Sequence, residues 1–118
     1  MNKNKHLGDT GERVVEEWLK SNGFTILARN FRSKSGEVDL IAKKYEVVAF
    51  VEVKTRINEY FATSMVVNKT KQRKIIKTAE LFVLTNKLRD LVFRFDVATV
   101  TFDTGKPQVT YIPNAFSL

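Results

Sequence analysis

Residues 36–56 read GEVDLIAKKYEVVAFVEVKTR. Two runs rich in Val, Ile and Phe flank the polar segment 43–46, a pattern that predicts two β-strands joined by a turn. Each strand is apolar beside the turn and charged at its far end. Because side chains alternate between the two faces of a strand, we expect Glu37, Asp39 and Ile41 to share one face of the first strand. The other face then carries Val38, Leu40 and Ala42.

The register of this hairpin decides which charges meet. If Lys43 and Val48 close the loop, Asp39 lies opposite Glu52. Two facing carboxylates with Cβ atoms about 5 Å apart destabilise a sheet unless a cation lies between them. Mg²⁺ is typically held by one or two carboxylates and several waters, so Asp39 and Glu52 predict a divalent metal site. Lys54, two residues beyond Glu52 on the same face, would orient or deprotonate a water, or neutralise charge developing on a phosphate.

Length and composition restrict the class of protein. With 118 residues, the chain has the size of one domain, and we expect residues 1–118 to form a single fold. There is no Cys and His6 is the single His, so any metal must be bound by oxygen. The longest apolar run, 47–51, is too short to cross a membrane, and the N-terminus lacks an apolar signal core. We therefore expect a cytoplasmic protein.

The charge balance favours a polyanionic partner. The 20 Lys and Arg residues against 13 Asp and Glu give a net charge of +7, as expected for a protein that binds nucleic acid. A helix expected at about 68–86 has an apolar stripe and an opposite side that is mostly basic. Like charges four residues apart weakly destabilise a helix, so we favour contact with a phosphate backbone over a plain solvated face. The predicted contacts are Arg32, Lys34, Arg56, Lys69, Lys71, Arg73, Lys74 and Lys77.

The remaining elements follow from periodicity and from turn residues. We expect a flexible arm at 1–7, a helix from Gly8 to about Gly23, and a loop at 57–65. Further strands are expected at 24–31, 92–102 and 108–112, the last ended by Pro113. Within the fourth strand, Arg94 and Asp96 share a face and are expected to form a structural ion pair. Three consecutive strands predict an antiparallel meander, and the long crossover helix predicts a parallel fourth strand, which together give an α/β fold with a mixed sheet flanked by helices.

Asp39 followed by Glu52-Val53-Lys54 resembles the PD-(D/E)XK nuclease motif, although Val38 stands where that motif has Pro. A series of segments along nearly the whole chain is similar to the YraN-type family, which is related at a distance to archaeal Holliday junction resolvases. These segments are Gly11-Glu12, Asn30-Phe31-Arg32, 36–42, 50–56, Lys71 and Arg94-Phe95-Asp96-Val97. The resemblance implies a restriction endonuclease-like αβββαβ core and a nuclease that uses Mg²⁺ or Mn²⁺.

Glu12 has two interpretations. Asp9 and Glu12 have the spacing of a capping box, in which Glu12 would be a first-turn acid that complements the helix dipole. The resemblance instead implies a glutamate near the metal, contributed by the first helix. Glu12 or Glu37 would then complete the set of metal ligands.

Three functions are compatible with these patterns. The first is a metal-dependent endonuclease that acts on DNA, with specificity for branched DNA implied by the resemblance alone. The second is a nucleic-acid-binding or scaffold protein that keeps the nuclease fold and cleaves nothing. In the third, a protein-interaction domain, Glu37–Lys54 and Glu52–Arg56 are structural pairs. A two-fold dimer would suit paired cuts in a four-way junction.

Overall fold

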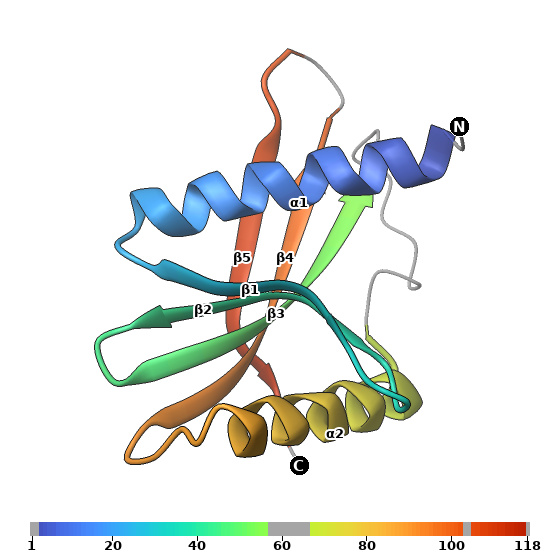
Figure 1. The fold of residues 1–118 in the computed structure, drawn as a ribbon. Helices are drawn as coiled ribbons and strands as arrows, with labels where there is room; N and C mark the ends of the chain where they lie inside the picture. The colour runs from blue at the N-terminus through green and yellow to red at the C-terminus, as the bar shows by residue number, and fades with distance from the viewer. Residues whose placement is uncertain (1–2, 57–66, 103–104, 118) are drawn as a thin grey trace.

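The computed structural model describes residues 3–56, 67–102 and 105–117. The elements in chain order are α1 (Lys3–Ser21), β1 (Thr25–Arg32), β2 (Glu37–Lys44), β3 (Val47–Arg56), α2 (Lys69–Thr85), β4 (Val92–Thr101) and β5 (Gln108–Phe116). The strands form one sheet in the order β1-β2-β3-β4-β5, with α1 across one face and α2 across the other (Figure 1). The expected α/β class, a restriction endonuclease-like core with a mixed sheet between helices, is confirmed.

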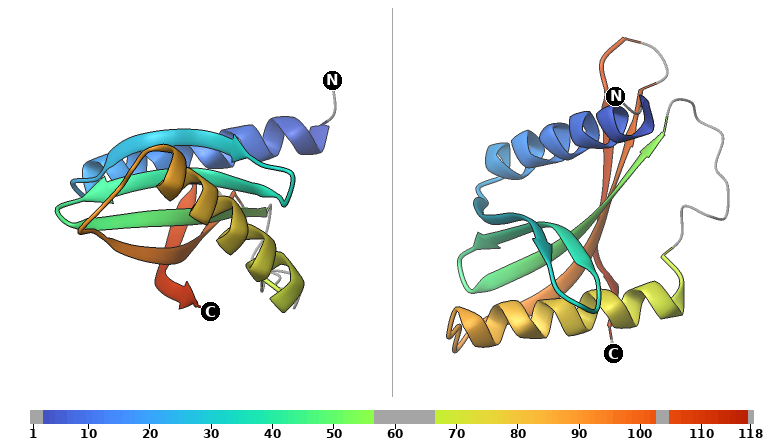
Figure 2. Two further views of the ribbon diagram at one scale, coloured as in Figure 1. Left: turned by 60° about the horizontal axis from the view of Figure 1, so that its bottom comes forward. Right: turned by 45° about the vertical axis from the view of Figure 1, so that its right-hand side comes forward.

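The strand pairing agrees with the predicted topology. β1, β2 and β3 form an antiparallel meander, and β4 pairs in parallel with β3 from Val47↔Val92 to Arg56↔Thr101. A parallel neighbour requires a crossover connection, which α2 supplies on one face of the sheet (Figure 2). In the β2–β3 hairpin, Lys43 pairs with Val48 and Leu40 with Val51, so the predicted register is confirmed along this ladder.

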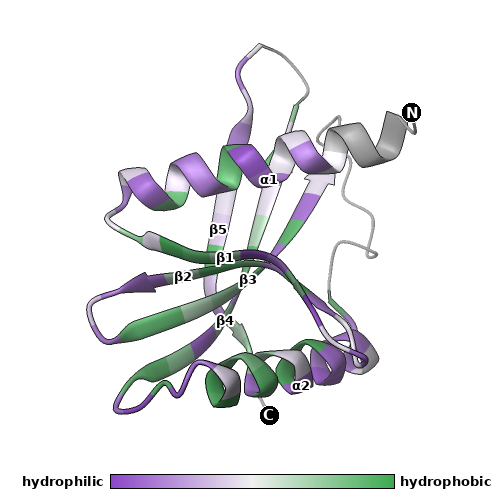
Figure 3. Ribbon diagram, in the orientation of Figure 1, coloured by the Kyte–Doolittle hydropathy of each residue, from purple (hydrophilic) through white to green (hydrophobic). Residues whose placement is uncertain are grey.

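Two apolar cores lie on the two faces of the sheet. On the α2 side, the ring of Phe50 meets Phe82 of the helix edge-on at 6.3 Å and stacks on Phe95 at 5.5 Å. On the α1 side, Trp18 stacks on Tyr111 of β5 with ring centroids 4.5 Å apart. Burying one such side chain contributes about 1.5–3 kcal/mol. Both helices contribute apolar residues to these cores, and Figure 3 shows the apolar residues of the strands in green between the two helices.

The pair predicted between Arg94 and Asp96 is confirmed, and it belongs to a larger buried network. Asp96 is fully buried and accepts hydrogen bonds from Nε and Nη2 of Arg94 at 2.9 Å. It also accepts from the hydroxyl of Tyr111 at 2.5 Å and from the backbone N–H of Asn114 at 2.8 Å. These donors stabilise a carboxylate that burial alone would disfavour, and they fix β5 to β4.

The N-terminal region differs from the prediction. Helix α1 begins at Lys3, so most of the expected arm at 1–7 is helical and Gly8 lies inside the helix. The polar N-terminal segment contains no Pro that would stop a helix. Its polarity alone does not indicate a loop, and the prediction of an arm is wrong for these residues. Glu12 is therefore not a first-turn residue, and the capping-box interpretation is wrong. At the other end the predicted stop is confirmed, with Gly23 at a φ of 88°.

Strict alternation along β2 also fails. Val38 packs in the α2-side core together with Ile41, not on the opposite face with Leu40. The change falls between Val38 and Leu40, whose partners on β1 are Phe31 and Arg29, and the residue between these partners is Asn30, with a φ of 50°. The β1–β2 hairpin bends toward α2, as Figure 1 shows.

The last strand is longer than predicted. β5 passes through Pro113 and reaches Phe116, which pairs with Phe95. A proline is tolerated here because β5 is an edge strand, and the register shifts between Phe95 and Val97. The caps of α2 are Asn68 and Asn86, as the expected range of 68–86 implies. The loop expected at 57–65 lies outside the described residues.

Candidate metal centre and nucleic-acid surface

The acidic ends of β2 and β3 lie side by side beneath α2. The β2–β3 ladder ends at Leu40↔Val51, and the next residues along each strand are Asp39 and Glu52. Oδ2 of Asp39 accepts a hydrogen bond from the backbone N–H of Val53 at 2.8 Å. Glu52 is 5% exposed, an unusually low value for an acid. The structure thus brings the two predicted acids together, Glu52 buried and Asp39 half-buried.

This proximity changes how Asp39 titrates. Burial, followed by the negative charge of Glu52, raises the pKa of Asp39 to about 8, against the smaller opposing effect of the Val53 hydrogen bond. A carboxyl with such a pKa holds its proton at neutral pH unless a cation compensates its charge. The pair is therefore electrostatically prepared for a positive partner.

Two lysines supply positive charge at the same oxygen. Nζ of Lys71 lies 2.5 Å from Oε2 of Glu52, and Nζ of Lys54 lies 3.5 Å from that oxygen. Burial and the neighbouring Lys71 charge lower the pKa of Lys54, although Glu52 opposes them. Burial opposes ionisation of Lys71 too, but its hydrogen bond to Glu52 raises its pKa. Lys54 is where the motif placed it, whereas the contact of Lys71 with Glu52 was not predicted.

The two outer acids are joined by a residue of β1. With its NH₂ group facing them, the side chain of Asn30 donates to Oε1 of Glu37 at 3.0 Å and to Oε1 of Glu12 at 3.2 Å. Burial raises the pKa of Glu12; the Asn30 hydrogen bond lowers it, while the charges of Asp9, Glu37 and Glu52 raise it further. Glu12 thus lies at the acidic site, at its rim.

These side chains line a cleft of about 270 Å³ between the sheet and α2. Its lining consists of Glu12, Gly36, Glu37, Asp39, Glu52, Val53, Lys54, Lys71, Lys74 and Ile75. Over the described part of the chain, no three acidic or histidine side chains converge tightly enough to hold an ion. The adjacent carboxylates of buried Glu52 and half-buried Asp39 nevertheless fit a hard cation such as Mg²⁺, which keeps several waters. Glu12 and Glu37, bridged by Asn30, line the same cleft, and their part in the ligand set stays a prediction.

A basic surface adjoins the cleft, formed by the 32–35 loop and the exposed side of α2. The loop is fixed to the helix, because the hydroxyls of Ser33 and Thr78 lie 2.7 Å apart. Thr78 is fully buried and also donates to the carbonyl of Lys74 at 2.9 Å. As a result, Lys34 of the loop and Lys77 of the helix line the same shallow hollow. Two basic segments that are separate in sequence form one surface.

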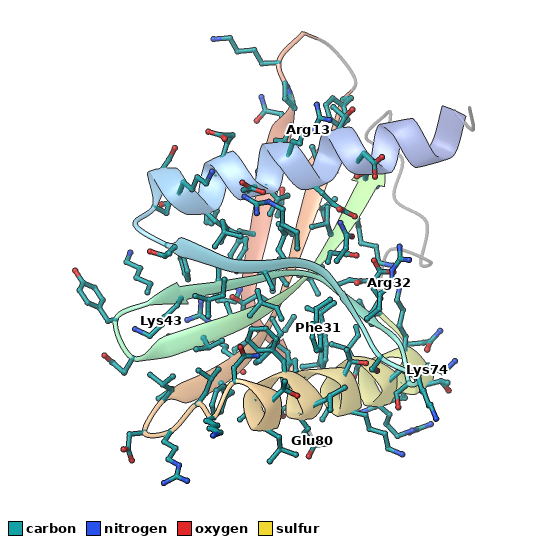
Figure 4. The ribbon with its side chains drawn as sticks, viewed as in Figure 1. Arg13, Phe31, Arg32, Lys43, Lys74 and Glu80 are labelled. Atoms are coloured by element: carbon teal, nitrogen blue, oxygen red, sulfur yellow. The ribbon has the colours of Figure 1, made fainter. Side chains whose placement is uncertain are left out.

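The predicted phosphate contacts divide into three groups. Arg32, Lys34, Lys69, Arg73, Lys74 and Lys77 are exposed residues of the basic surface. Figure 4 shows Arg32 and Lys74 at the same end of the molecule, while Arg13 lies on the far helix and Lys43 near the hairpin turn. Lys71 points instead at Glu52. Arg56 is only 7% exposed and its Nε donates to Thr101 at 3.4 Å, so it does not lie on the exposed basic surface, and its contact with phosphate stays a prediction.

The proposed structural pairs of a protein-interaction domain do not form as expected. Glu37 pairs with Arg32 at 3.5 Å, and not with Lys54. Glu52 pairs with Lys54 and Lys71, and not with Arg56. The charges at the end of the sheet therefore converge on one cleft.

Sequence reasoning missed two features that build this site. Asn30 was named only within the segment Asn30-Phe31-Arg32 of the family resemblance. An Asn inside a predicted strand could have indicated a residue with positive φ, which Asn adopts more readily than most residues. Gly11 permits close helix packing, since a Cβ there would lie 2.0 Å from Oγ1 of Thr55. A glycine inside an amphipathic helix is such a signal, because it costs helix stability unless packing requires it.

A mixed five-stranded sheet between two helices, with an Asp on one strand and Glu-x-Lys on the next, defines a restriction endonuclease-like protein. Residues 11–100 match the profile of the family described as "Uncharacterised protein family UPF0102". The chain belongs to this family, the YraN family that the sequence segments resembled.

Relatives from several bacteria share the whole length of the chain. The UPF0102 protein of Caldicellulosiruptor saccharolyticus is 44% identical over 119 residues, covering 98% of this chain and 100% of the relative. Those of Geotalea daltonii and Geobacter metallireducens are 43% and 40% identical, covering 94% and 95% of the relatives and 99% and 98% of this chain. Among the described residues, neither helix is long and apolar enough to span a membrane.

Proposed function

We propose that this protein is a metal-dependent endonuclease that acts on DNA. The observation that supports the proposal best is the convergence of Asp39, Glu52 and Lys54 in one cleft beside a basic surface. The raised pKa of Asp39 supports it further, because a purely structural cross-strand pair gains nothing from two adjacent acids.

Each residue of the cleft has a distinct role in this proposal. Asp39 and Glu52 would hold Mg²⁺ or Mn²⁺. When bound, such an ion would lower the pKa of a coordinated water and would polarise the phosphate. Lys54 holds the attacking water or neutralises charge that develops on the phosphate, and its lowered pKa brings proton exchange closer to neutral pH. Asn30 joins Glu12 and Glu37 through its amide group at the rim of the cleft.

The basic surface positions the nucleic acid. Lys34 and Lys77 line one hollow, and Lys74 lines both the basic side of α2 and the acidic cleft. A backbone held by these residues passes next to Asp39 and Glu52. Such contacts carry no sequence information, so the proposal predicts recognition of DNA by charge and shape.

The preferred DNA structure follows from the resemblance to junction resolvases alone. A branched substrate is one candidate, and paired cuts in a four-way junction would require two copies of this chain. Chromosomal DNA as substrate would place the protein in the cytoplasm.

The decisive experiment incubates the protein with linear, flapped and four-way DNA in Mg²⁺, in Mn²⁺ and in chelator. Cleavage should require metal and should be lost in Asp39→Asn, Glu52→Gln and Lys54→Ala. The matched control is Glu46→Gln, which neutralises an exposed acid in the turn of the same hairpin.

Two results would count against the proposal. Cleavage that survives Asp39→Asn would show that the activity arises elsewhere. Tight DNA binding without cleavage of any substrate in either metal would favour the second function, a nucleic-acid-binding protein with a nuclease fold.

A further inference from the structure

The contact between Lys71 and Glu52 has no part in the proposed reaction as described. Lys71 is the third residue of α2, and its side chain is 46% exposed along its length while its ammonium reaches the 5% exposed Glu52. The two atoms are 2.5 Å apart, closer than the 3.5 Å from Lys54 to the same oxygen. The closest cation at this carboxylate thus comes from the helix and not from the sheet.

The base of Lys71 is firmly placed. Its backbone N–H donates to the side chain of Asn68 at 2.8 Å, and Gln72 beside it donates to the carbonyl of Val67 at 2.8 Å. Val67 itself is buried in the α2-side core. Only the side chain of Lys71 has freedom to move, between Glu52 and the solvent at the rim of the cleft.

A positive side chain in the first turn of a helix is electrostatically unfavourable, because the helix dipole is positive there. The first turn of α2 contains no acid, so the compensating charge for Lys71 comes from Glu52 across the cleft. A phosphate at the rim would compensate it equally well. The ammonium therefore has two alternative anionic partners, one inside the cleft and one outside.

Building on the function proposed above, we propose that Lys71 is a displaceable cation that neutralises Glu52 until a divalent metal binds. A divalent ion held by Asp39 and Glu52 would compete with the ammonium for the Glu52 carboxylate and would repel it, so metal binding would release Lys71. The released side chain then pairs with a DNA phosphate at the rim. Metal binding consequently increases the affinity for DNA. By thermodynamic linkage, DNA binding increases the affinity for the metal by the same factor.

The first test measures Mn²⁺ binding by calorimetry without DNA. Lys71→Gln should bind Mn²⁺ about tenfold more tightly than wild type, the lower end of effects that groups next to metal ligands have on affinity. The control is Lys74→Gln, which removes the same charge from the same cleft, whereas the ion pairs of Glu52 among the described residues go to Lys54 and Lys71. Lys74→Gln should change Mn²⁺ affinity much less.

The second test measures the salt dependence of duplex DNA binding in chelator, where no metal contributes. Lys71→Gln should leave the slope of log affinity against log salt unchanged, because Glu52 already occupies this lysine. Glu52→Gln should free Lys71 and steepen the slope by about one, and adding Lys71→Gln to Glu52→Gln should abolish that gain. Melting temperatures of all variants establish that each is folded.

The results separate this inference from the nuclease proposal. If Lys71→Gln and Lys74→Gln bind Mn²⁺ alike, or if Lys71→Gln alone already lowers the salt slope in chelator, Lys71 is an ordinary phosphate contact and the inference is wrong. Metal-dependent cleavage would be untouched by that outcome. If neither wild type nor Lys71→Gln binds Mn²⁺, both proposals fail.

Discussion

A Cβ atom on Gly11 would lie 2.0 Å from Oγ1 of Thr55, a separation that real Cβ atoms do not show. Helix α1 therefore crosses the end of β3 at a point where only a hydrogen fits. Glu12 is the next residue, and the same close approach brings its carboxyl to the rim of the acidic cleft. The packing of this helix and the composition of the site are thus linked by one glycine.

Gly11→Ala should lower the free energy of unfolding by about 1–3 kcal/mol, because overpacking outweighs the better helix propensity of Ala. Gly8 is the matched control, since a Cβ there meets nothing within 4 Å. Gly8→Ala should instead raise the free energy of unfolding by up to about 1 kcal/mol. Chemical denaturation measures both, and equal effects of the two substitutions would contradict the packing argument.

Asp39→Asn should separate stability from metal binding. It replaces a carboxyl whose ionised form is disfavoured by burial and by the charge of Glu52, so without metal the variant should be at least as stable as wild type. Mg²⁺ or Mn²⁺ should raise the melting temperature of wild type by binding only the folded state, and should leave Asp39→Asn unchanged. A wild type that melts alike with metal and with chelator, and a variant that melts lower, would mean that Asp39 is structural.

Stability should also depend on pH through Asp39. Burial and the Glu52 charge raise its pKa from 3.8 to about 8 in the folded protein. Between these values the folded state keeps a proton that the unfolded state has lost, so the free energy of unfolding falls as pH rises from about 4 to about 8. Denaturation in chelator should show a smaller fall for Asp39→Asn. If the free energy of unfolding falls equally with pH in wild type and in Asp39→Asn, the group with the raised pKa is not Asp39.

Asn30 should influence Glu12 through its amide and the strand through its backbone. Asn30→Gly keeps the positive φ of 50° but removes the amide, and Asn30→Ala also strains the backbone by about 1–2 kcal/mol. Because the Asn30 hydrogen bond lowers the pKa of Glu12, both variants should raise that pKa in an NMR titration. Only Asn30→Ala should also lower the free energy of unfolding by the amount of this backbone strain. A Glu12 pKa that is unchanged in Asn30→Gly would show that the amide does not reach it.

Tyr111→Phe should test the buried network around Asp96. It keeps the ring that stacks on Trp18 but removes the hydroxyl that donates to Asp96. A hydrogen bond to a buried charge is worth about 1.5–3 kcal/mol, and we expect a loss of this size in thermal or chemical unfolding. Tyr45→Phe, at an 80% exposed turn residue, should change stability by less than about 0.5 kcal/mol. A loss no larger than that of Tyr45→Phe would mean that Arg94 and Asn114 satisfy Asp96 alone.

The sequence by itself determined the β2–β3 hairpin, and the register assumed from its turn placed Asp39 near Glu52, next to the last pair of the ladder, Leu40↔Val51. These are consequences of short-range patterns, because apolar alternation and a polar turn define two strands and their loop. The order of elements likewise determined that β4 lies parallel to its partner, since a crossover helix separates the two strands. Lys54 followed from its spacing to Glu52.

Only the tertiary structure decided which other residues join them. An amphipathic pattern shows which side of a helix faces the sheet, but not how far along the sheet the helix lies. That axial position brings Lys71 of α2 to Glu52 and Glu12 of α1 to the rim, whereas Arg56 is buried next to Thr101. Periodicity likewise cannot reveal the positive φ of Asn30, because one residue in the left-handed region leaves no mark on an alternating sequence pattern.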